Sequence, residues 1–330
     1  MNCLEIFLSS WFSNKFIIPS VVTNLVQVRY FHPTCNMAHS KWEYVRKFET
    51  NNDKLLPGTW AVARIDGRGF HKFAKTHKWT RPNDLRGINL MNHAAKVVLN
   101  EFEDIILGYG QSDEYSFVFR RETEVFERRE TKIITTLVSK FASAYVFHWS
   151  KYFPDEQLLY PPSFDGRIVL YPTDVSLRDY LCWRQADCHI NNLYNTTFWN
   201  LVLKGNLTNN EAEKRLSGTL SGDKNEILFS QFGINYNEEP EVFRKGTVLV
   251  QKEKSPKMPR KHYMQQKDKA ADHQKQASSA EDQQSKLTKI EERMESITEL
   301  NCDIIGQKFW DDYPHLINPN ATKSKSQPAR

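Results

Sequence analysis

Three acidic residues lie where the chain leaves short apolar segments, at points where glycine and polar residues indicate turns. Asp66 follows the segment Trp60–Ile65, whereas Asp113 and Glu114 lie in a polar break between two later apolar segments. Carboxylates brought close together repel one another unless a cation lies between them. Mg²⁺ takes oxygen ligands, keeps waters and is usually completed by substrate phosphates. These residue types therefore predict a magnesium site for phosphoryl transfer, provided that the fold brings the two turns together.

The residues after Asp66 supply a second feature that phosphate groups require. Gly67 and Gly69 let the main chain approach a ligand closely, so that its N–H groups can surround phosphate oxygens. Arg68 or His71 can add charge-assisted hydrogen bonds. An isolated Asp-Gly pair is usually only a turn, and a polar hairpin needs no metal. The joint placement of the two motifs nevertheless favours a metal and triphosphate site.

The apolar pattern predicts the elements that position these residues. Strands are expected at 60–66, 105–109, 115–119 and 167–171, and helices at about 84–104 and 125–149. Their order, β-α-β-β-α-β, is the ferredoxin-like arrangement, an α+β fold in which an antiparallel sheet is backed by two helices. The first strand of that fold lies in the sheet centre beside the hairpin strands. Asp66, Asp113 and Glu114 are therefore expected at one edge of the sheet.

The rest of the chain divides by composition. Residues 37–172 form the predicted catalytic domain, and helices beginning near Ser176 and Thr208 make 173–250 its helical C-terminal part. From 251 to 285 Lys, Gln, Ser, Asp and Glu dominate, which predicts a disordered polar insert. Apolar residues at spacings of three and four then predict an amphipathic helix, followed by a tail, over 286–330. The apolar positions of that helix are Leu287, Ile290, Met294, Ile297 and Leu300.

Composition excludes several classes of protein. The chain has 330 residues, 39% of them hydrophobic and 26% charged, which is enough for a sizeable core. No apolar stretch approaches about 18 residues, so no membrane span is expected. The five cysteines include no C-x2-C pair, so no structural zinc site is expected, and their odd number suits a reducing compartment. The net charge of +5 permits an RNA partner without demanding one.

Residues 1–36 are apolar, contain serine and carry a single acid, Glu5. This composition indicates either a mitochondrial targeting sequence, although one thin in arginine, or a dispensable disordered extension. Translation from Met37, directly ahead of the capping box Ser40-x-x-Glu43, would give a cytosolic form. The expected location is therefore cytoplasmic, mitochondrial or both.

A second group of polar residues lies on the helix expected after Ser176. Gln185, His189 and Asn192 are three or four residues apart and so share one helix face. Such a face can read RNA edges or bind phosphate, but it can equally be a hydrogen-bonded face packed on the sheet. The sequence leaves both interpretations open.

Two basic features have the same ambiguity. Lys224 can reach a triphosphate as a point charge, or it can be an ordinary solvated lysine. Arg128, Arg129 and Lys132 form a basic patch on a predicted helix, which suits a tRNA backbone or a solvated helix face equally well.

Four blocks of the sequence resemble the signature blocks of the tRNA-histidine guanylyltransferase family. They are 64–71 (RIDGRGFH), 109–119 (YGQSDEYSFVF), 183–195 (WRQADCHINNLYN) and 223–229 (DKNEILF). The similarity runs from about Met37 to Glu253 and resumes at 302–306, whereas the stretch 254–298 resembles no family motif. Gly69 stands where other members have a polar residue, so a side-chain contact is not expected there. Blocks of this length are too extended to match by chance.

The resemblance implies a palm fold like that of template-directed polymerases, with nucleotide addition in the 3′-to-5′ direction. It implies that a guanylate is joined to the 5′ end of tRNA-His, at position −1. ATP would first activate the 5′ monophosphate, and the 3′-hydroxyl of GTP would then attack it, with two Mg²⁺ ions per active site. It also implies a homotetramer, since the family is commonly tetrameric.

Carried over residue by residue, the resemblance assigns Asp66, Asp113 and the main-chain carbonyl of Gly67 as metal ligands. Asp66, Asp113 and Glu114 are the predicted catalytic acids, with Glu114 in a supporting role. The predicted nucleotide-binding residues are Asp66, Gly67, Arg68, Gly69, Phe70, His71, Ser112, Asp113 and Lys224. His189 and Asn192 are the predicted tRNA contacts. No covalent nucleophile is required, because phosphoryl transfer depends on positioning and charge neutralisation.

Two other functions stay open at this stage. A nucleotidyl cyclase on a similar palm would also use two acids and Mg²⁺, but it would leave the blocks after residue 180 without a role. A non-catalytic nucleotide- or RNA-binding protein would not need intact Asp66 and Asp113. Extension of tRNA-His by one nucleotide, production of a cyclic nucleotide, and binding without turnover distinguish the three.

Overall fold

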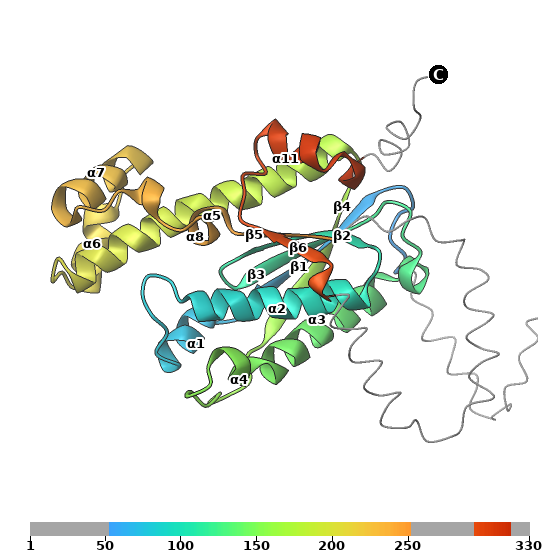
Figure 1. Cartoon of the computed structure of the whole chain (residues 1–330), viewed down its shortest axis with the longest axis horizontal. Coiled ribbons are helices and arrows are strands. Elements are labelled where there is room, and N and C mark those ends of the chain that lie inside the picture. The colour runs from blue at the N-terminus through green and yellow to red at the C-terminus, as the bar shows by residue number, and fades with distance from the viewer. Residues whose placement is uncertain (1–52, 252–293, 318–330) are drawn as a thin grey trace, which may run out of the picture. The chain divides into compact units, whose positions relative to one another are not determined.

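The computed structural model describes residues 53–251 and 294–317 (Figure 1). The predicted extension at 1–36, the predicted insert from 252 to 285 and the first two positions of the predicted C-terminal helix, Leu287 and Ile290, lie outside these residues. None of the helices within the described ranges is long and apolar enough to cross a membrane.

The centre of the fold is a six-stranded antiparallel sheet with the strand order β4-β1-β3-β2-β5-β6. The strands are β1 (Trp60–Gly67), β2 (Ile105–Gln111), β3 (Glu114–Phe119), β4 (Phe164–Tyr171), β5 (Thr247–Gln251) and β6 (Ile297–Leu300). With α2 (Leu85–Glu101) and α3 (Glu130–Phe147), the first four strands follow the predicted β-α-β-β-α-β order, and β1 lies between β4 and β3. The predicted ferredoxin-like α+β fold is therefore confirmed.

Strand alternation buries the sheet on both faces. Along β1, Ala61, Ala63 and Ile65 enter the core beneath α2 and α3. Trp60 and Val62 point to the opposite face, which packs against α5 (Asp174–Leu203). Figure 1 shows α2 and α3 on one side of the sheet and α5 on the other. The even-numbered residues of β1, including Asp66, therefore belong to the α5 side.

The first residues of the two backing helices, α2 and α3, are set by the residues that precede them. Asp84 caps α2, because its carboxylate accepts a hydrogen bond from the N–H of Arg86 (3.0 Å). The predicted helix from Val125 starts later, at Glu130, because a 3₁₀ turn with positive φ values precedes it. In that turn the side chain of Arg128 is buried and donates to main-chain oxygens, including those of Leu55 and Leu56. The predicted basic patch is therefore wrong for Arg128.

Further helices complete the fold. Helix α1 (Phe70–Thr76) follows β1 directly, and α4 (Trp149–Tyr152) follows α3. Helices α6 (Asn209–Leu216), α7 (Ser221–Phe232) and α8 (Glu241–Lys245) pack against α5. Helix α11 (Gln307–Asp312) closes the core on the α5 side of the sheet.

Two predictions about the C-terminal part are wrong in detail. Residues 173–250 are not all helical, because β5 begins at Thr247, and Gln251 belongs to this strand rather than to an insert. Ile297 and Leu300, predicted to lie on an amphipathic helix, form β6 and pair with β5. In a strand, a spacing of three places Ile297 and Leu300 on opposite faces, where they pack into the two different cores, and the open edge of β5 selects the strand.

Candidate active site

The structure brings the two acidic turns together at one edge of the sheet. Asp66 is the direct register partner of Glu114 across β1 and β3, so the two side chains lie on the same face. The N–H of Gly67 donates to the main-chain oxygen of Asp113 (3.0 Å). This bond joins the end of β1 to the turn between β2 and β3, as the predicted topology requires.

The turn itself consists of two residues. Ser112 has a φ of 48°, in the left-handed region that such tight hairpins use, and it is exposed. Its hydroxyl donates to a carboxylate oxygen of Asp113 (3.1 Å). Ser112 thereby orients Asp113, which is half-buried beside the end of β1.

Glu114 is buried and its carboxylate is fully engaged with neighbouring side chains. Gln111 donates to Oε1 (2.8 Å), Arg64 donates to Oε2, and Nη1 of Arg184 lies 3.3 Å from Oε2. Arg64 also donates to Asp66 (2.7 Å). Glu114 is therefore placed to position the site through the two arginines, and its oxygens are already occupied.

Burial and like charge shift the two remaining acids. Burial, together with the charges of Asp66 and Glu114, raises the pKa of Asp113 to about 6. Burial likewise raises the pKa of Asp66, with Glu114 and Asp165 adding to the shift and Arg64 opposing it. Both carboxylates therefore occupy surroundings in which an added cation would stabilise their charged forms.

The donors at this edge suit Mg²⁺. Asp66 and Asp113 offer hard carboxylate oxygens, and the main-chain carbonyl of Gly67 lies next to them in the chain. The described residues contain no group of three or more His, Cys, Asp or Glu side chains that could cage a metal alone. Mg²⁺ needs no such cage, because waters and substrate phosphates complete its shell. The residues present therefore fit a magnesium site that the substrate completes.

The segment after Asp66 divides into exposed and buried residues. A Cβ on Gly67 would lie 2.3 Å from the ring of Phe70, so this position has no room for a side chain. Phe70 is buried in the core, and only its main chain can face a nucleotide. Arg68 and His71 are exposed, so their side chains are free to approach a ligand.

The polar face of α5 contributes to packing rather than to the site. Gln185 donates to the main-chain oxygens of Lys245 and Cys302 (both 2.9 Å) and accepts from the N–H of Ile304 (2.8 Å). Of the two interpretations left open by the sequence, the packed hydrogen-bonded face is the one that holds for this residue.

The two predicted tRNA contacts differ in whether their side chains are still accessible to a partner. Asn192 is buried, accepts from Asn83 (2.9 Å) and donates to the hydroxyl of Tyr236 (3.0 Å). Its amide therefore has little capacity left for RNA. His189 is exposed, with its ring 5.4 Å from that of Tyr236, and only it remains open to a partner.

Lys224 lies on α7, which packs against α5. Its ammonium donates to the main-chain oxygen of Thr219 (2.8 Å) and lies 6.0 Å from the ring of Tyr194. No described contact joins Lys224 to Asp66 or Asp113, so the structure does not bring this predicted residue into the acidic cluster.

Sequence reasoning missed four residues of the site, namely Arg64, Gln111, Arg184 and Asp165. Arg64 and Gln111 lie within blocks that had been singled out, and the strand period of two places Arg64 on the same face as Asp66. Asp165 is the register partner of Asp66 on β4. Arg184 also lies within such a block, 183–195, but no local pattern indicated its contact with Glu114, which depends on how α5 crosses the sheet.

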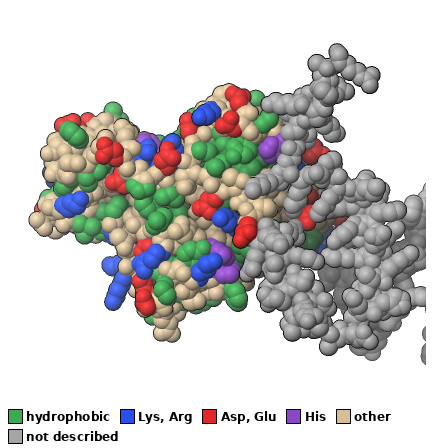
Figure 2. Space-filling model, viewed as in Figure 1, with side chains coloured by type: hydrophobic (Ala, Val, Ile, Leu, Met, Phe, Trp, Pro, Cys, Tyr) green, Lys and Arg blue, Asp and Glu red, His purple; other side chains and the backbone are tan. Residues whose placement is uncertain are grey.

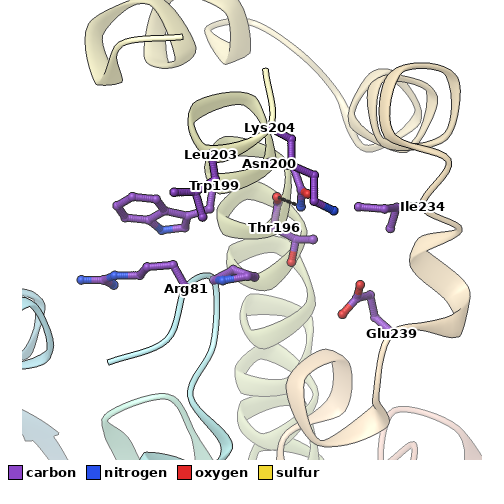
Figure 3. Close-up of a pocket in the computed structure, with 9 residues that line it drawn as sticks. Arg81, Thr196, Trp199, Asn200, Leu203, Lys204, Ile234 and Glu239 are labelled. Carbon is purple, nitrogen blue, oxygen red and sulfur yellow. Dashed lines mark hydrogen bonds between the residues drawn. The ribbon is translucent and has the colours of Figure 1, made fainter. Parts of the chain in front are cut away.

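A cavity of about 200 Å³ lies elsewhere, where the loop before α2 meets the end of α5 (Figure 3). The guanidinium of Arg81 lies 4.8 Å from the ring of Trp199 there, and Lys204 lines the same cavity. None of the residues predicted for the site lines it. On the face shown in Figure 2, basic and acidic side chains of the described residues are intermixed rather than separated by sign.

Comparison with known proteins gives a consistent result. The family profile described as tRNAHis guanylyltransferase matches residues 42–172, and the profile described as Thg1 C terminal domain matches residues 175–306. The "Probable tRNA(His) guanylyltransferase" of Homo sapiens is 47% identical over 293 residues, which cover 89% of this chain and 93% of that protein. The tRNA(His) guanylyltransferase of Schizosaccharomyces pombe is 61% identical over 214 residues, covering 65% of this chain and 81% of that protein.

Solved structures resemble the fold as well. The crystal structure of tRNA(His) guanylyltransferase from Saccharomyces cerevisiae is 46% identical and matches with a TM-score of 0.62, covering 68% of this chain and 99% of that chain. A bacterial protein like tRNA(His) guanylyltransferase, solved in complex with ATP, has a similar fold at 24% identity and a TM-score of 0.54. It covers 63% of this chain and 86% of that chain.

Proposed function

The chain belongs to the tRNAHis guanylyltransferase family of nucleotidyltransferases, and on that premise we propose that it adds a guanylate to the 5′ end of tRNA-His, at position −1. The observation that carries the proposal is the meeting of two turns. Asp66 lies opposite Glu114 in the sheet. The main-chain oxygen of Asp113 accepts a hydrogen bond from the N–H of Gly67, the residue after Asp66. A cluster of carboxylates at a sheet edge, in which the pKa values of Asp66 and Asp113 are raised, suits the transfer of a phosphoryl group.

The proposed reaction has two displacements at phosphorus. In the first, an oxygen of the tRNA 5′ monophosphate attacks the α-phosphorus of ATP and pyrophosphate leaves. In the second, the 3′-hydroxyl of GTP attacks the activated 5′ phosphorus, its proton passes to solvent, and AMP leaves with the electron pair of the broken P–O bond. Loss of pyrophosphate from the added nucleotide then gives a 5′-monophosphorylated product.

Each residue of the site has a proposed task in this reaction. Asp66, Asp113 and the carbonyl of Gly67 would hold two Mg²⁺ ions, which neutralise phosphate charge and polarise the attacking and leaving oxygens when bound. The main chain after Gly67, with Arg68 and His71, would bind the triphosphate of GTP. The N–H groups of Gly67 and Arg68 already donate to the main-chain oxygens of Asp113 and Ser163, so neither is available to a phosphate.

Glu114 would act through other residues. Its carboxylate accepts a hydrogen bond from Arg64, and Arg64 also donates to Asp66. Glu114 would thus orient one proposed metal ligand without touching the substrate. The exposed His189 stays a proposed tRNA contact. The homotetrameric state and a cytoplasmic or mitochondrial location are proposed from the family resemblance alone.

The proposal is tested by incubating the full chain with GTP, ATP, Mg²⁺ and 5′-phosphorylated tRNA-His and looking for a one-nucleotide extension. Asp66→Asn and Asp113→Asn are each expected to lower the rate by more than about a hundredfold while the fold is kept. The matched control is Asp179→Asn, an exposed acid on α5, which is expected to leave the rate unchanged.

Two results would contradict the proposal. Full activity of Asp66→Asn or Asp113→Asn, measured in chelated buffer to which Mg²⁺ is then restored, would contradict the proposed metal site. A cyclic nucleotide as the product would indicate a cyclase, and nucleotide binding by the wild-type chain without any turnover would indicate a non-catalytic protein.

A further inference from the structure

An aromatic side chain lies exposed beside the candidate active site. Trp183 on α5 has 58% of its surface exposed, although tryptophan is usually mostly buried. The guanidinium carbon of Arg184 lies 3.4 Å from the centroid of its ring, so this cation covers one face of the indole. With one face covered and most of the residue exposed, the other face of the ring is the accessible one.

The side of α5 on which Trp183 lies follows from its neighbours. One flank of α5 contacts the C-terminal segment, because Arg178 donates to Gln307 and Gln185 donates to the main chain of Cys302. The opposite flank faces β4, because the rings of Tyr180 and Tyr171 lie 5.0 Å apart. Trp183 lies 6.3 Å from Tyr180, ring to ring, and so belongs to this second flank.

This flank of α5 adjoins the sheet surface that carries the catalytic acids. Arg64 and Asp66 on β1 are register partners of Arg167 and Asp165 on β4, and all four lie on the α5 face of the sheet. Arg184, whose guanidinium covers one face of the Trp183 ring, also lies 3.3 Å from Glu114. The exposed indole is therefore linked to the acidic cluster through one buried side chain.

Two buried donors near this surface lack a partner. The Nε atoms of Arg64 and Arg184 are buried and have no hydrogen-bond partner among the described residues. The Arg184 side chain is only 4% exposed. Both atoms are too buried for a ligand to contact, so what the two arginines contribute to this surface is the positive charge of their guanidinium groups.

We propose that the open face of Trp183 stacks against a nucleobase of a substrate bound at the active site. Every nucleobase has a π face that stacks on an aromatic ring, and the arginine behind the indole adds positive charge to a surface that must accept phosphates. The base comes from the activating ATP or from the 5′ end of the tRNA. This inference rests on the proposed function for the identity of these substrates.

The test compares Trp183→Leu, which removes the aromatic ring, with Trp183→Phe, which keeps one. The matched control is Phe147→Leu, a still more exposed aromatic residue on α3, beyond the opposite face of the sheet. Dissociation constants are measured with Mg²⁺ for α,β-methylene-ATP and, separately, for 5′-phosphorylated tRNA-His. Sedimentation and the melting temperature of each variant are recorded in parallel.

Trp183→Leu is expected to weaken the binding of one of the two ligands by about tenfold, whereas Trp183→Phe stays within about threefold of wild type. Weaker binding of the ATP analogue would assign the adenine of ATP to the indole, and weaker binding of tRNA would assign an RNA base. The ligand assigned in this way should also quench wild-type tryptophan fluorescence more than it quenches that of Trp183→Phe. A purely structural role of the ring would not produce this difference.

Unchanged binding of both ligands by Trp183→Leu would overturn the inference. A change in sedimentation together with the loss would also overturn it, because Trp183 would then belong to an interface between copies of the chain. A wild-type chain that binds the ligands but does not extend tRNA would refute the proposed function instead. The two failures are therefore separable.

Discussion

Adjacent acids in the hairpin have different tasks because strand geometry points them in different directions. Glu114 is the first residue of β3, and its side chain lies on the α5 face, where Arg64 and Arg184 neutralise it. Asp113 lies in the turn, and no described arginine pairs with it. Its charge is therefore free to be neutralised by a bound Mg²⁺ ion, and burial raises its pKa to about 6.

At the residue scale, the Asp113 pKa of about 6 predicts a pH dependence of Mg²⁺ binding. A carboxyl group must lose its proton to ligate Mg²⁺, and Asp113 is protonated below pH 6. The apparent affinity for Mg²⁺ is therefore expected to fall about tenfold per pH unit below about 6, and to level off above it. Calorimetric titration of the nucleotide-free chain at several pH values measures this.

The control for this dependence is Asp113→Asn, which should bind Mg²⁺ weakly and without an inflection near pH 6. An inflection of equal size in that variant would show that another group titrates.

The buried contact of Arg184 with Glu114 gives a second prediction at this scale. Arg184→Met leaves a buried carboxylate with one fewer cation, so the free energy of unfolding is expected to fall by about 3 kcal/mol. Adding Glu114→Gln should restore part of the stability, because the unpaired charge is removed. The double variant should nevertheless have low tRNA extension activity, because Arg64 no longer has the carboxylate partner that aligns it toward Asp66.

Chemical denaturation of the two single variants and the double variant measures the stability effect. Strictly additive losses would mean that Arg184 and Glu114 stabilise the protein independently.

The element that depends most on a single residue is the turn from β1 into α1. The chain must leave the sheet at Gly67 and enter a helix at Phe70, whose ring packs into the core against Phe73 and Phe164. That ring lies where any side chain at position 67 would project. The proposed phosphate-binding segment is thus positioned by an aromatic side chain in the core rather than by its own polar groups.

Gly67→Ala is therefore expected to destabilise the protein by about 1–3 kcal/mol, through contact of the new methyl group with Phe70. Gly222→Ala on exposed α7 is the control, because a Cβ there meets nothing within 4 Å. Melting temperatures compare the two. Relief of the loss by a second change, Phe70→Leu, would support the cause, and equal effects of both glycine variants would contradict it.

At the scale of the whole molecule, the C-terminal segment completes the sheet and one of its cores. β6 pairs with β5, and buried Asn92 on α2 donates to both Thr247 and Glu299, which belong to these two strands. Farther along, the apolar residues Ile304, Phe309, Trp310 and Leu316 cover the α5 side of the sheet. The fold is therefore closed by residues distant in sequence from the two turns that contain Asp66 and Asp113.

Deletion of residues 254–285 is expected to leave folding and tRNA extension nearly unchanged. Gln251 and Ile297 are register partners, so a shorter connection can still join β5 to β6, and shortening that loop less than fourfold changes its closure free energy by only about 1 kcal/mol. Deletion of 294–317 is the contrasting variant and should abolish cooperative unfolding, because it uncovers a core. Loss of solubility or activity in the first variant would show that the insert is structural.

The sequence alone determined the features that depend on neighbouring residues. Strand alternation, helix caps and the polar hairpin placed Asp66 and Asp113 at one sheet edge and predicted the ferredoxin-like order that the structure has. The family resemblance rested on contiguous blocks, and all four blocks lie within the residues that the two family profiles match. Such signals are local, because periodicity and turn chemistry act over a few residues.

Only the tertiary structure decided which polar groups remain free to act. It showed that the amides of Gln185 and Asn192 are occupied by partners far along the chain, and that Arg64 and Arg184 neutralise Glu114. It also selected a strand for Ile297–Leu300. Hydrogen-bond partners, buried charges and open strand edges depend on contacts between distant segments, and no local pattern specifies which segments will meet.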